Sequence, residues 1–301
     1  MIWRDLNLAV ALLACAAPAL AQDAPLSSAR QLTANYAFDL VPSPANDRSV
    51  LIRMIEGREQ LFLSKIDDSG EEQLTHGDAD HEDPAWSPDG KSIAFVLIKD
   101  GKKALALLDP GSGKVEVIGP AGHSPIHPAF TPDGKSLLYC TDDDLRPPTK
   151  NESQLYAIDL ATRQVRTLVS GGVNTYPVMS PDGRQIAWRK IIGDMNSEVF
   201  VADADGKNAR NITNHEAWEG WPAWSPDGKT IAFAGNRNAA WQIYLVDPDG
   251  ANLRLLAATE GRGTAPKWAP DGKSIFYTIC RSSQERRGCD IYVADIPEVK
   301  R

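Results

Sequence analysis

The chain has 301 residues, with 40 acidic and 32 basic side chains and a formal net charge of −8. A partner with a phosphate backbone needs clustered cations, and this acidic chain contains no long basic run, so we exclude nucleic-acid binding. Its acidity is typical of a soluble protein.

The first 21 residues are typical of a secretory signal peptide. Arg4 precedes an apolar stretch, and residues 19–21 form a small-x-small cleavage site. The apolar stretch is too short to span a bilayer comfortably, so we expect no transmembrane segment. Cleavage leaves residues 22–301, which we expect to form one periplasmic domain. A lipobox-like sequence ending at Cys15 leaves an alternative open, in which a lipid on that cysteine anchors the protein to a membrane.

One turn sequence recurs along the rest of the chain. Five copies read Pro-Asp-Gly, and a degenerate sixth begins with Ser43-Pro44. The prolines stand at 44, 88, 132, 181, 226 and 270, so the intervals are 44, 44, 49, 45 and 44 residues. A period of about 40–45 residues is the length of one four-stranded propeller blade.

The segments around each turn are typical of strands. Segments such as Pro84-Ala85-Trp86 precede the turn, and β-branched and aromatic segments such as Ile93-Ala94-Phe95 follow it. A third strand and a more polar fourth complete each unit. Six such units predict an all-β, six-bladed β-propeller. We expect the repeated tryptophans to pack between blades; they are Trp86, Trp224 and Trp268.

The last unit ends without a fourth strand. Residues 30–33 read like the fourth strands at 72–75 and 210–213. We therefore expect the N-terminal segment to supply the outer strand of the last blade and to close the ring.

The cysteines predict one disulfide. Cys280 ends the second strand of the last unit and Cys289 begins its third, so the two can meet across neighbouring strands. Export makes their oxidation favourable. Cys140, at the end of an apolar strand, is expected to be a buried hydrophobic residue.

The repeated unit resembles that of TolB-type propellers, with the closest text at 221–233 and 242–256. The resemblance covers nearly all of residues 30–296, and it extends to peptidase-associated and oligogalacturonate-lyase-like propellers. It implies a propeller that, in TolB, docks the peptidoglycan-associated lipoprotein at one mouth of the ring. The chain shows no counterpart of the α/β domain that precedes the propeller in TolB.

The position before the proline that opens each inner strand varies in chemistry, while the residues around it repeat. Variation at a repeated position indicates use rather than packing, although drift could also produce it. Trp218 adds another aromatic side chain near this position, and loops after the second strands add further exposed groups. The predicted partner-binding residues are Asp83, His127, Tyr176, Trp218, Trp221, Arg237, Asp143 and Arg146.

These residues favour a non-enzymatic module that binds an envelope protein or peptide at the channel mouth, as a monomer. A nucleophile elbow of the G-x-S-x-G type is absent from the sequence, which speaks against a serine hydrolase. His81 and His127 are weak candidates for metal binding without a ligand motif, so we predict no metal or other cofactor. The alternative function is a carbohydrate-active enzyme or sugar-binding propeller that uses the histidine and acid cluster, and a small-molecule sensor is a third.

Overall fold

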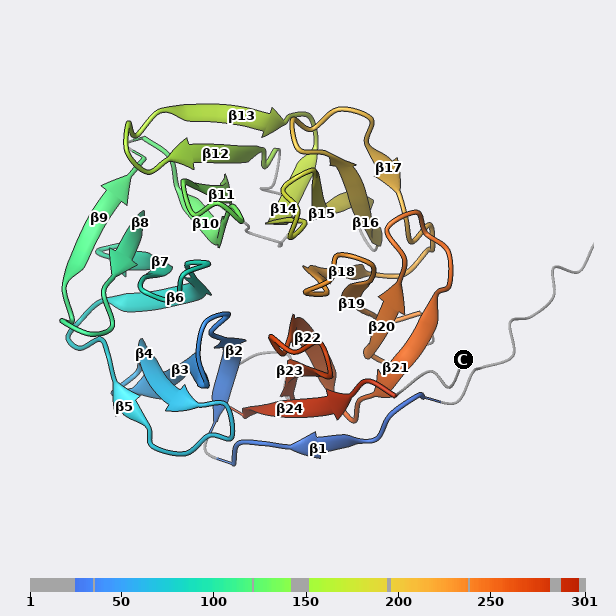
Figure 1. Cartoon of the computed structure of the whole chain (residues 1–301), viewed down its shortest axis with the longest axis horizontal. Helices are drawn as coiled ribbons and strands as arrows, with labels where there is room; N and C mark the ends of the chain where they lie inside the picture. The colour runs from blue at the N-terminus through green and yellow to red at the C-terminus, as the bar shows by residue number, and fades with distance from the viewer. Residues whose placement is uncertain are drawn as a thin grey trace, which may run out of the picture.

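The computed structural model describes residues 25–34, 36–120, 122–141, 152–193, 196–237, 239–281 and 288–297. In this part of the chain every element is a strand, and the strands form six four-stranded antiparallel sheets around an axial channel (Figure 1). The prediction of a six-bladed β-propeller is confirmed. The described residues contain no helix that could cross a membrane.

Each blade runs outward from the channel in the order inner, second, third and outer strand. The inner strands are β2 (Ala37–Pro42), β6 (Asp80–Trp86), β10 (Pro125–Phe130), β14 (Val173–Met179), β18 (Glu219–Trp224) and β22 (Arg262–Trp268). The second strands are β3 (Arg48–Ile55), β7 (Ile93–Lys99), β11 (Ser136–Thr141), β15 (Gln185–Gly193), β19 (Ile231–Gly235) and β23 (Ser274–Cys280).

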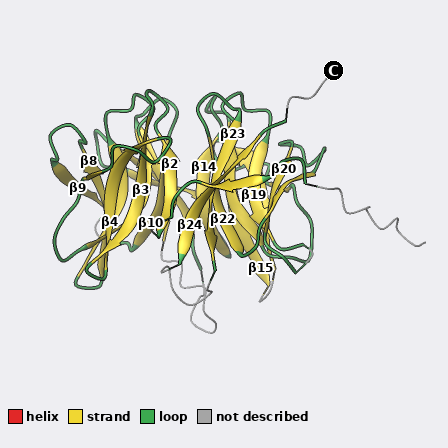
Figure 2. Cartoon of the chain, turned by 90° about the horizontal axis from the view of Figure 1, so that it is seen from below, coloured by secondary structure: helices red, strands yellow, loops and turns green. Residues whose placement is uncertain are grey.

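The third strands are β4 (Arg58–Lys65), β8 (Lys102–Leu108), β12 (Leu155–Asp159), β16 (Asn196–Asp203), β20 (Gln242–Val246) and β24 (Cys289–Asp295). The outer strands are β5 (Glu72–Gln73), β9 (Val115–Gly119), β13 (Val165–Val169), β17 (Arg210–Asn211), β21 (Arg254–Ala258) and β1 (Ala29–Gln31). The repeated turns join inner to second strands at one end of the ring, which we call the turn side. Second and third strands join at the opposite end, the hairpin side, and both ends are visible in the side view (Figure 2).

The repeated turn has the expected chemistry. In blade two the Ser87 hydroxyl donates to Asp89 Oδ1 at 2.7 Å, and the Gly90 amide donates to the Ser87 carbonyl at 2.9 Å. Gly90 has a φ of 68°, which favours glycine. A Cβ at Gly90 would lie 2.7 Å from the Ala45 Cβ, so glycine also lets the turns of adjacent blades approach.

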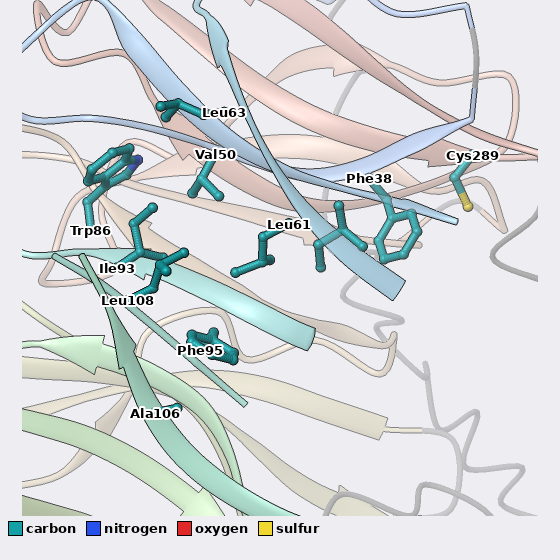
Figure 3. Packing of buried hydrophobic residues seen from close by; sticks show 11 residues of the cluster. Phe38, Val50, Leu61, Leu63, Trp86, Ile93, Phe95, Ala106, Leu108 and Cys289 are labelled. Carbon is teal, nitrogen blue, oxygen red and sulfur yellow. The ribbon is translucent and has the colours of Figure 1, made fainter. Parts of the chain in front are cut away.

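Neighbouring blades bury their apolar faces against each other. Between blades one and two the buried side chains include Phe38, Leu61, Trp86 and Phe95 (Figure 3). The Trp86 indole N–H donates to the Val41 carbonyl of the preceding blade at 3.0 Å. Apolar burial contributes roughly 25 cal/mol per Å², so these interfaces stabilise the ring.

The other repeated tryptophans take similar places. The Trp268 indole N–H donates to the Ala223 carbonyl at 3.0 Å, again one repeat earlier in the chain. Trp224 packs against the buried cluster shared by blades four and five. The packing of these tryptophans between blades, expected from the repeat, is therefore present.

The ring closes by pairing the two ends of the chain. Strand β1 lies antiparallel to β24 on the outside of the last blade, with Arg30 opposite Val293 (Figure 1). The Thr33 hydroxyl extends this pairing by accepting the Ile291 N–H at 3.0 Å. Before β1, the Leu26 N–H donates to the Leu255 carbonyl of blade five at 3.1 Å. The predicted closure is confirmed, and the same segment also fastens blade five.

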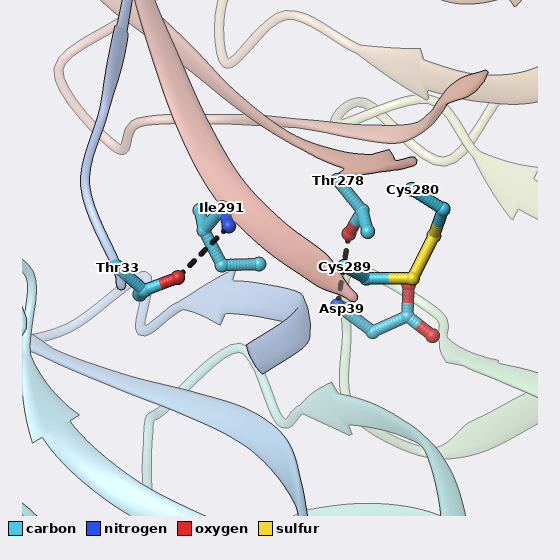
Figure 4. The surroundings of a disulfide bond; sticks show 6 residues. All are labelled: Thr33, Asp39, Thr278, Cys280, Cys289 and Ile291. Atoms are coloured by element: carbon cyan, nitrogen blue, oxygen red, sulfur yellow. Dashed lines mark hydrogen bonds between the residues drawn. A yellow bond between two sulfur atoms is a disulfide. The ribbon is translucent and has the colours of Figure 1, made fainter. Parts of the chain in front are cut away.

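The predicted disulfide is present. Cys280 and Cys289 stand directly opposite each other in the ladder of β23 and β24, and their sulfur atoms are bonded (Figure 4). Cys140 is buried and forms no disulfide with any described residue, as expected from its apolar strand.

Candidate functional site

Six residues, one from each inner strand, share one backbone conformation. Each has a φ between 51° and 55° and lies within a β-bulge of its strand; they are Asp39, Asp83, His127, Tyr176, Trp221 and Ala265. Non-glycine residues in this region cost about 1 kcal/mol or more each, and a bulge re-aims the side chain that follows it. We call these residues the bulge ring. Since all six blades have the same backbone geometry at this position, they differ here only in side-chain chemistry.

The bulge ring explains why the inner strands begin earlier than the sequence indicates. From the sequence we expected each inner strand to begin at its proline. Strand β6 begins at Asp80, four residues before Pro84. The bulge accommodates Asp83 at positive φ, and the ladder to β7 resumes at Ala85. The predicted residues Asp83, His127, Tyr176 and Trp221 therefore lie inside the inner strands rather than in the linkers that enter them.

A cavity of about 450 Å³ occupies the channel between the bulge ring and the repeated turns. All six ring residues line it, together with the turn prolines Pro44, Pro88, Pro132 and Pro181. Ligand sites commonly have about 300–1,000 Å³, so this space can hold a few amino-acid side chains or a small molecule.

One half of the cavity wall is polar. The His127 amide donates to Asp83 Oδ2 at 3.1 Å, and its ring Nε2 lies 3.8 Å from the same oxygen. The other ring nitrogen, Nδ1, is 3.3 Å from the Cys140 sulfur. Asp39, in the neighbouring blade, donates its backbone N–H to Thr278 Oγ1 at 3.1 Å (Figure 4).

Blade six completes the polar half with a lysine. Its ring residue, Ala265, carries only a methyl group, and Lys267 lines the cavity two residues later. Burial lowers the pKa of Lys267, and the carboxylates of Asp39 and Asp83 partly offset this effect. Sequence reasoning missed Lys267, although the equivalent residues of the other blades are all apolar: Val41, Ala85, Ala129, Val178 and Ala223.

The other half of the wall is aromatic, and its rings begin a row that ends at Trp241, outside the cavity lining. His127 stacks on Tyr176 with ring centroids 3.6 Å apart and planes inclined by 24°. Tyr176 contacts Trp221 at 5.4 Å, and Trp221 meets Trp241 edge-to-face at 5.6 Å. Such pairs contribute about 0.5–1.5 kcal/mol beyond their buried area.

Two arginines lie against this row on the hairpin side. The guanidinium carbon of Arg189 is 4.9 Å from the Tyr176 centroid and 5.3 Å from that of Trp221. That of Arg262 is 5.7 Å from Trp221 and 5.2 Å from Trp241.

Neither arginine was predicted as a site residue. Arg189 was detectable, because the matching residues of the other second strands are uncharged: Ile52, Val96, Cys140, Ala234 and Thr278. Gly220 makes room for it, since a Cβ there would lie 2.4 Å from the Arg189 Cδ.

Two predicted partner contacts lie away from the cavity. The Arg237 side chain is only 10% exposed, forms an ion pair with the buried Glu219 and donates to the Thr213 carbonyl at 3.0 Å. Trp218 donates its backbone N–H to Asn236 Oδ1 at 2.8 Å, at the junction of blades four and five. Both therefore stabilise local structure. Asp143 and Arg146 lie outside the described residues.

The two histidines considered for metal binding are in separate places. His81 is 5% exposed, its ring contacts Phe95 at a centroid distance of 5.4 Å, and burial lowers its pKa. His127 belongs to the cavity wall. Within the part of the chain that the structure describes, no three His, Cys, Asp or Glu side chains gather closely enough to hold a metal ion.

The repeat matches the model of a known protein family. The TolB beta propeller domain matches residues 146–296, which are 151 of the 301 residues and so half of the chain. A protein TolB homolog of Chlorobium chlorochromatii is 28% identical over 169 residues, covering 54% of this chain and 37% of that protein. The uncharacterized peptidase YuxL of Bacillus subtilis is 26% identical over 181 residues, covering 58% of this chain and 25% of the peptidase.

The chain thus spans between a quarter and somewhat over a third of these curated relatives. Among solved structures, TolB from Acinetobacter baumannii superposes with a TM-score of 0.64 at 21% identity, covering 88% of this chain and 65% of that one. This likeness shows the fold alone. Because a peptidase and a TolB homolog share the repeat, the fold by itself does not decide between catalysis and binding.

Proposed function

The chain belongs to the TolB β-propeller family, and on this basis we propose that it is an exported, non-enzymatic module that binds a peptide or protein segment in its channel. The observation that carries the proposal is the bulge ring. Six blades present one backbone geometry toward an open cavity, yet the side chains differ from acid to imidazole to large aromatic. A scaffold that repeats its backbone and varies its lining is suited to recognition.

The cavity has the chemistry of a recognition surface. Tyr176 and Trp221 offer large, rigid apolar faces, which are common anchors of protein interfaces. Asp39, Asp83 and Lys267 provide charged groups on the opposite side of the same cavity. A peptide segment can therefore place an apolar side chain against the aromatic row while its polar groups meet the acids and the lysine.

The proposed partner is an envelope protein or peptide. The resemblance to TolB, whose propeller docks the peptidoglycan-associated lipoprotein at one mouth of the ring, supports a partner of this class, and this chain shares the repeat. We place the mature protein in the periplasm as a monomer, in line with the signal sequence at 1–21.

The experiment is a pull-down from envelope extract, followed by affinity measurement on the captured protein. Trp221→Leu and Tyr176→Ala should each weaken binding by about 1–3 kcal/mol, which is roughly tenfold to a hundredfold. Tyr36→Ala is the matched control, since this tyrosine is 56% exposed and lies outside the cavity lining. Retained affinity in both folded cavity variants would refute channel binding.

The contact between His127 and Asp83 favours one second candidate, a carbohydrate-active enzyme. An imidazole oriented by a carboxylate on a cavity wall is an arrangement that can act as a general base. Turnover of a polysaccharide by the purified protein, lost in a folded His127→Gln variant, would favour this candidate. Capture of an envelope protein with no turnover would favour the recognition module.

A further inference from the structure

We propose that the hairpin side of the channel holds a second site, formed by Arg262 with Arg189 and Trp241, which binds a carboxylate group of a peptide. The site is distinct from the cavity on the turn side, because neither arginine nor Trp241 lines that cavity. Trp221 takes part in both places, since it lines the cavity and its ring centroid is 5.3 Å and 5.7 Å from the guanidinium carbons of Arg189 and Arg262.

The register of the strands places both arginines on the hairpin side of the bulge ring. Arg189 stands opposite Thr175, the residue before Tyr176, in the ladder of β14 and β15. Its Nε donates to Thr175 Oγ1 at 2.9 Å, which fixes its direction. Arg262 is the first residue of β22, and Trp241 comes directly before β20 at the end of the hairpin in blade five.

Arg262 is the residue whose surroundings favour a bound anion. Its guanidinium lies between two indoles, at 5.7 Å from Trp221 and 5.2 Å from Trp241. Its Nε is buried and makes no hydrogen bond to any described residue. A cation held in apolar surroundings beside a second cation is costly unless an opposite charge joins it. Burial lowers the pKa of Arg262, Tyr176 partly offsets this effect, and Arg189 lowers the pKa further.

A carboxylate fits this position. The planar guanidinium binds a carboxylate through two parallel N–H···O bonds, and both gain strength where water is excluded. A single negative charge balances the charge of Arg262, the arginine whose Nε makes no hydrogen bond to any described residue, so a monoanionic carboxylate is sufficient. The printed contacts of Arg262 are the faces of Trp221 and Trp241, which offer apolar surface to the body of a peptide residue beside its carboxylate. We therefore assign the site to a peptide carboxylate.

The test uses N-acetylglycine as the probe, because it carries a peptide-like C-terminal carboxylate. The indole N–H signal of Trp241, assigned with a Trp241→Phe variant, should shift saturably in ¹⁵N NMR titrations. The neutral analogue N-acetylglycinamide should leave this signal unchanged. Arg262→Gln should weaken the apparent affinity roughly tenfold or more, because a charge-assisted contact is lost. Arg166→Gln, at an exposed arginine of β13, is the matched control and should bind as the wild type does.

A second measurement separates a binding role from a structural one. If Arg262 has no counter-ion in the free protein, Arg262→Gln should melt at or above the temperature of the wild type, and N-acetylglycine should raise the melting temperature of the wild type only. A marked fall in the melting temperature of Arg262→Gln would overturn the proposal, because it would reveal a structural partner. Equal responses to the acid and the amide, or stronger binding of inorganic phosphate or galacturonate, would also overturn it.

Discussion

The imidazole of His127 stacks on the phenol ring of Tyr176, and this contact joins blades three and four at the channel wall. It is where the polar half of the cavity meets its aromatic half. Tyr176 also contacts Trp221 and the guanidinium of Arg189, so one side chain links the imidazole, the indole and a buried cation.

We expect Tyr176→Ala to lower the free energy of unfolding by about 1–3 kcal/mol, since it removes one stacked pair, one tilted pair and one cation–π contact. Urea denaturation followed by circular dichroism measures the loss. Tyr36→Ala should change stability little, because that side chain is 56% exposed. Equal effects of the two substitutions would contradict the importance of the aromatic row.

Lys267 should make stability depend on alkaline pH. Its pKa is lower in the folded protein than in the unfolded chain, where it is about 10.4, so the unfolded state binds the proton more tightly. The free energy of unfolding contributed by this group therefore rises as the pH increases from the lowered pKa toward about 10.4. Lys267→Met should remove that rise.

The measurement for Lys267 is the difference in unfolding free energy between variant and wild type at several alkaline pH values. Lys273→Met serves as the control, because Lys273 is an exposed lysine in the turn of the same blade. A constant difference across this range would show that the Lys267 amine titrates as it does in water.

Glu198 should give the opposite dependence at acidic pH. Burial and the neighbouring Glu219 raise its pKa, although it accepts hydrogen bonds from Thr213 Oγ1 at 2.5 Å and from the His215 amide at 2.8 Å. The folded state then holds the proton more tightly than the unfolded state. The contribution of Glu198 to stability is therefore present below about pH 4.3 and is lost as the pH rises through the raised pKa.

Glu198→Gln imitates the protonated acid. The free energy of unfolding of this variant, relative to the wild type, should therefore increase as the pH rises from about 4 toward about 8. Guanidinium unfolding at a series of pH values measures this trend. The exposed Glu216→Gln is the control and should show a flat difference. A flat difference for Glu198→Gln as well would show that its pKa is unshifted.

The ring closure makes a prediction for the N-terminal segment. Thr33→Val keeps the shape of the side chain but removes the acceptor of the Ile291 N–H, so it should cost about 1 kcal/mol. Deleting residues 25–33 should cost several times more and should lower the melting temperature of the whole ring in one transition, because β24 loses its outer neighbour. Ser28→Ala is the control. A deletion variant that melts as the wild type does would contradict the closure.

The sequence by itself determined the architecture, because the information for it is local and repeated. The Pro-Asp-Gly turns, the strand patterns and the 44- to 49-residue spacing indicate the blades, and residues 30–33 show the outer-strand pattern that the last unit lacks. The disulfide follows from the same register, since Cys280 and Cys289 are opposite each other in neighbouring strands. Local hydrogen bonding and side-chain alternation suffice for such features.

The tertiary structure decided which side chains meet. A positive φ at Asp83 has no sequence signature like that of glycine, so the bulge and the earlier start of β6 were not foreseeable from the residues. Arg262 and Trp241 come from neighbouring blades, and only the radial packing brings them to within 5.2 Å. Repeats encode the blade, whereas the channel is built from one or two residues of each blade, whose contacts depend on how six separate sheets close around one axis.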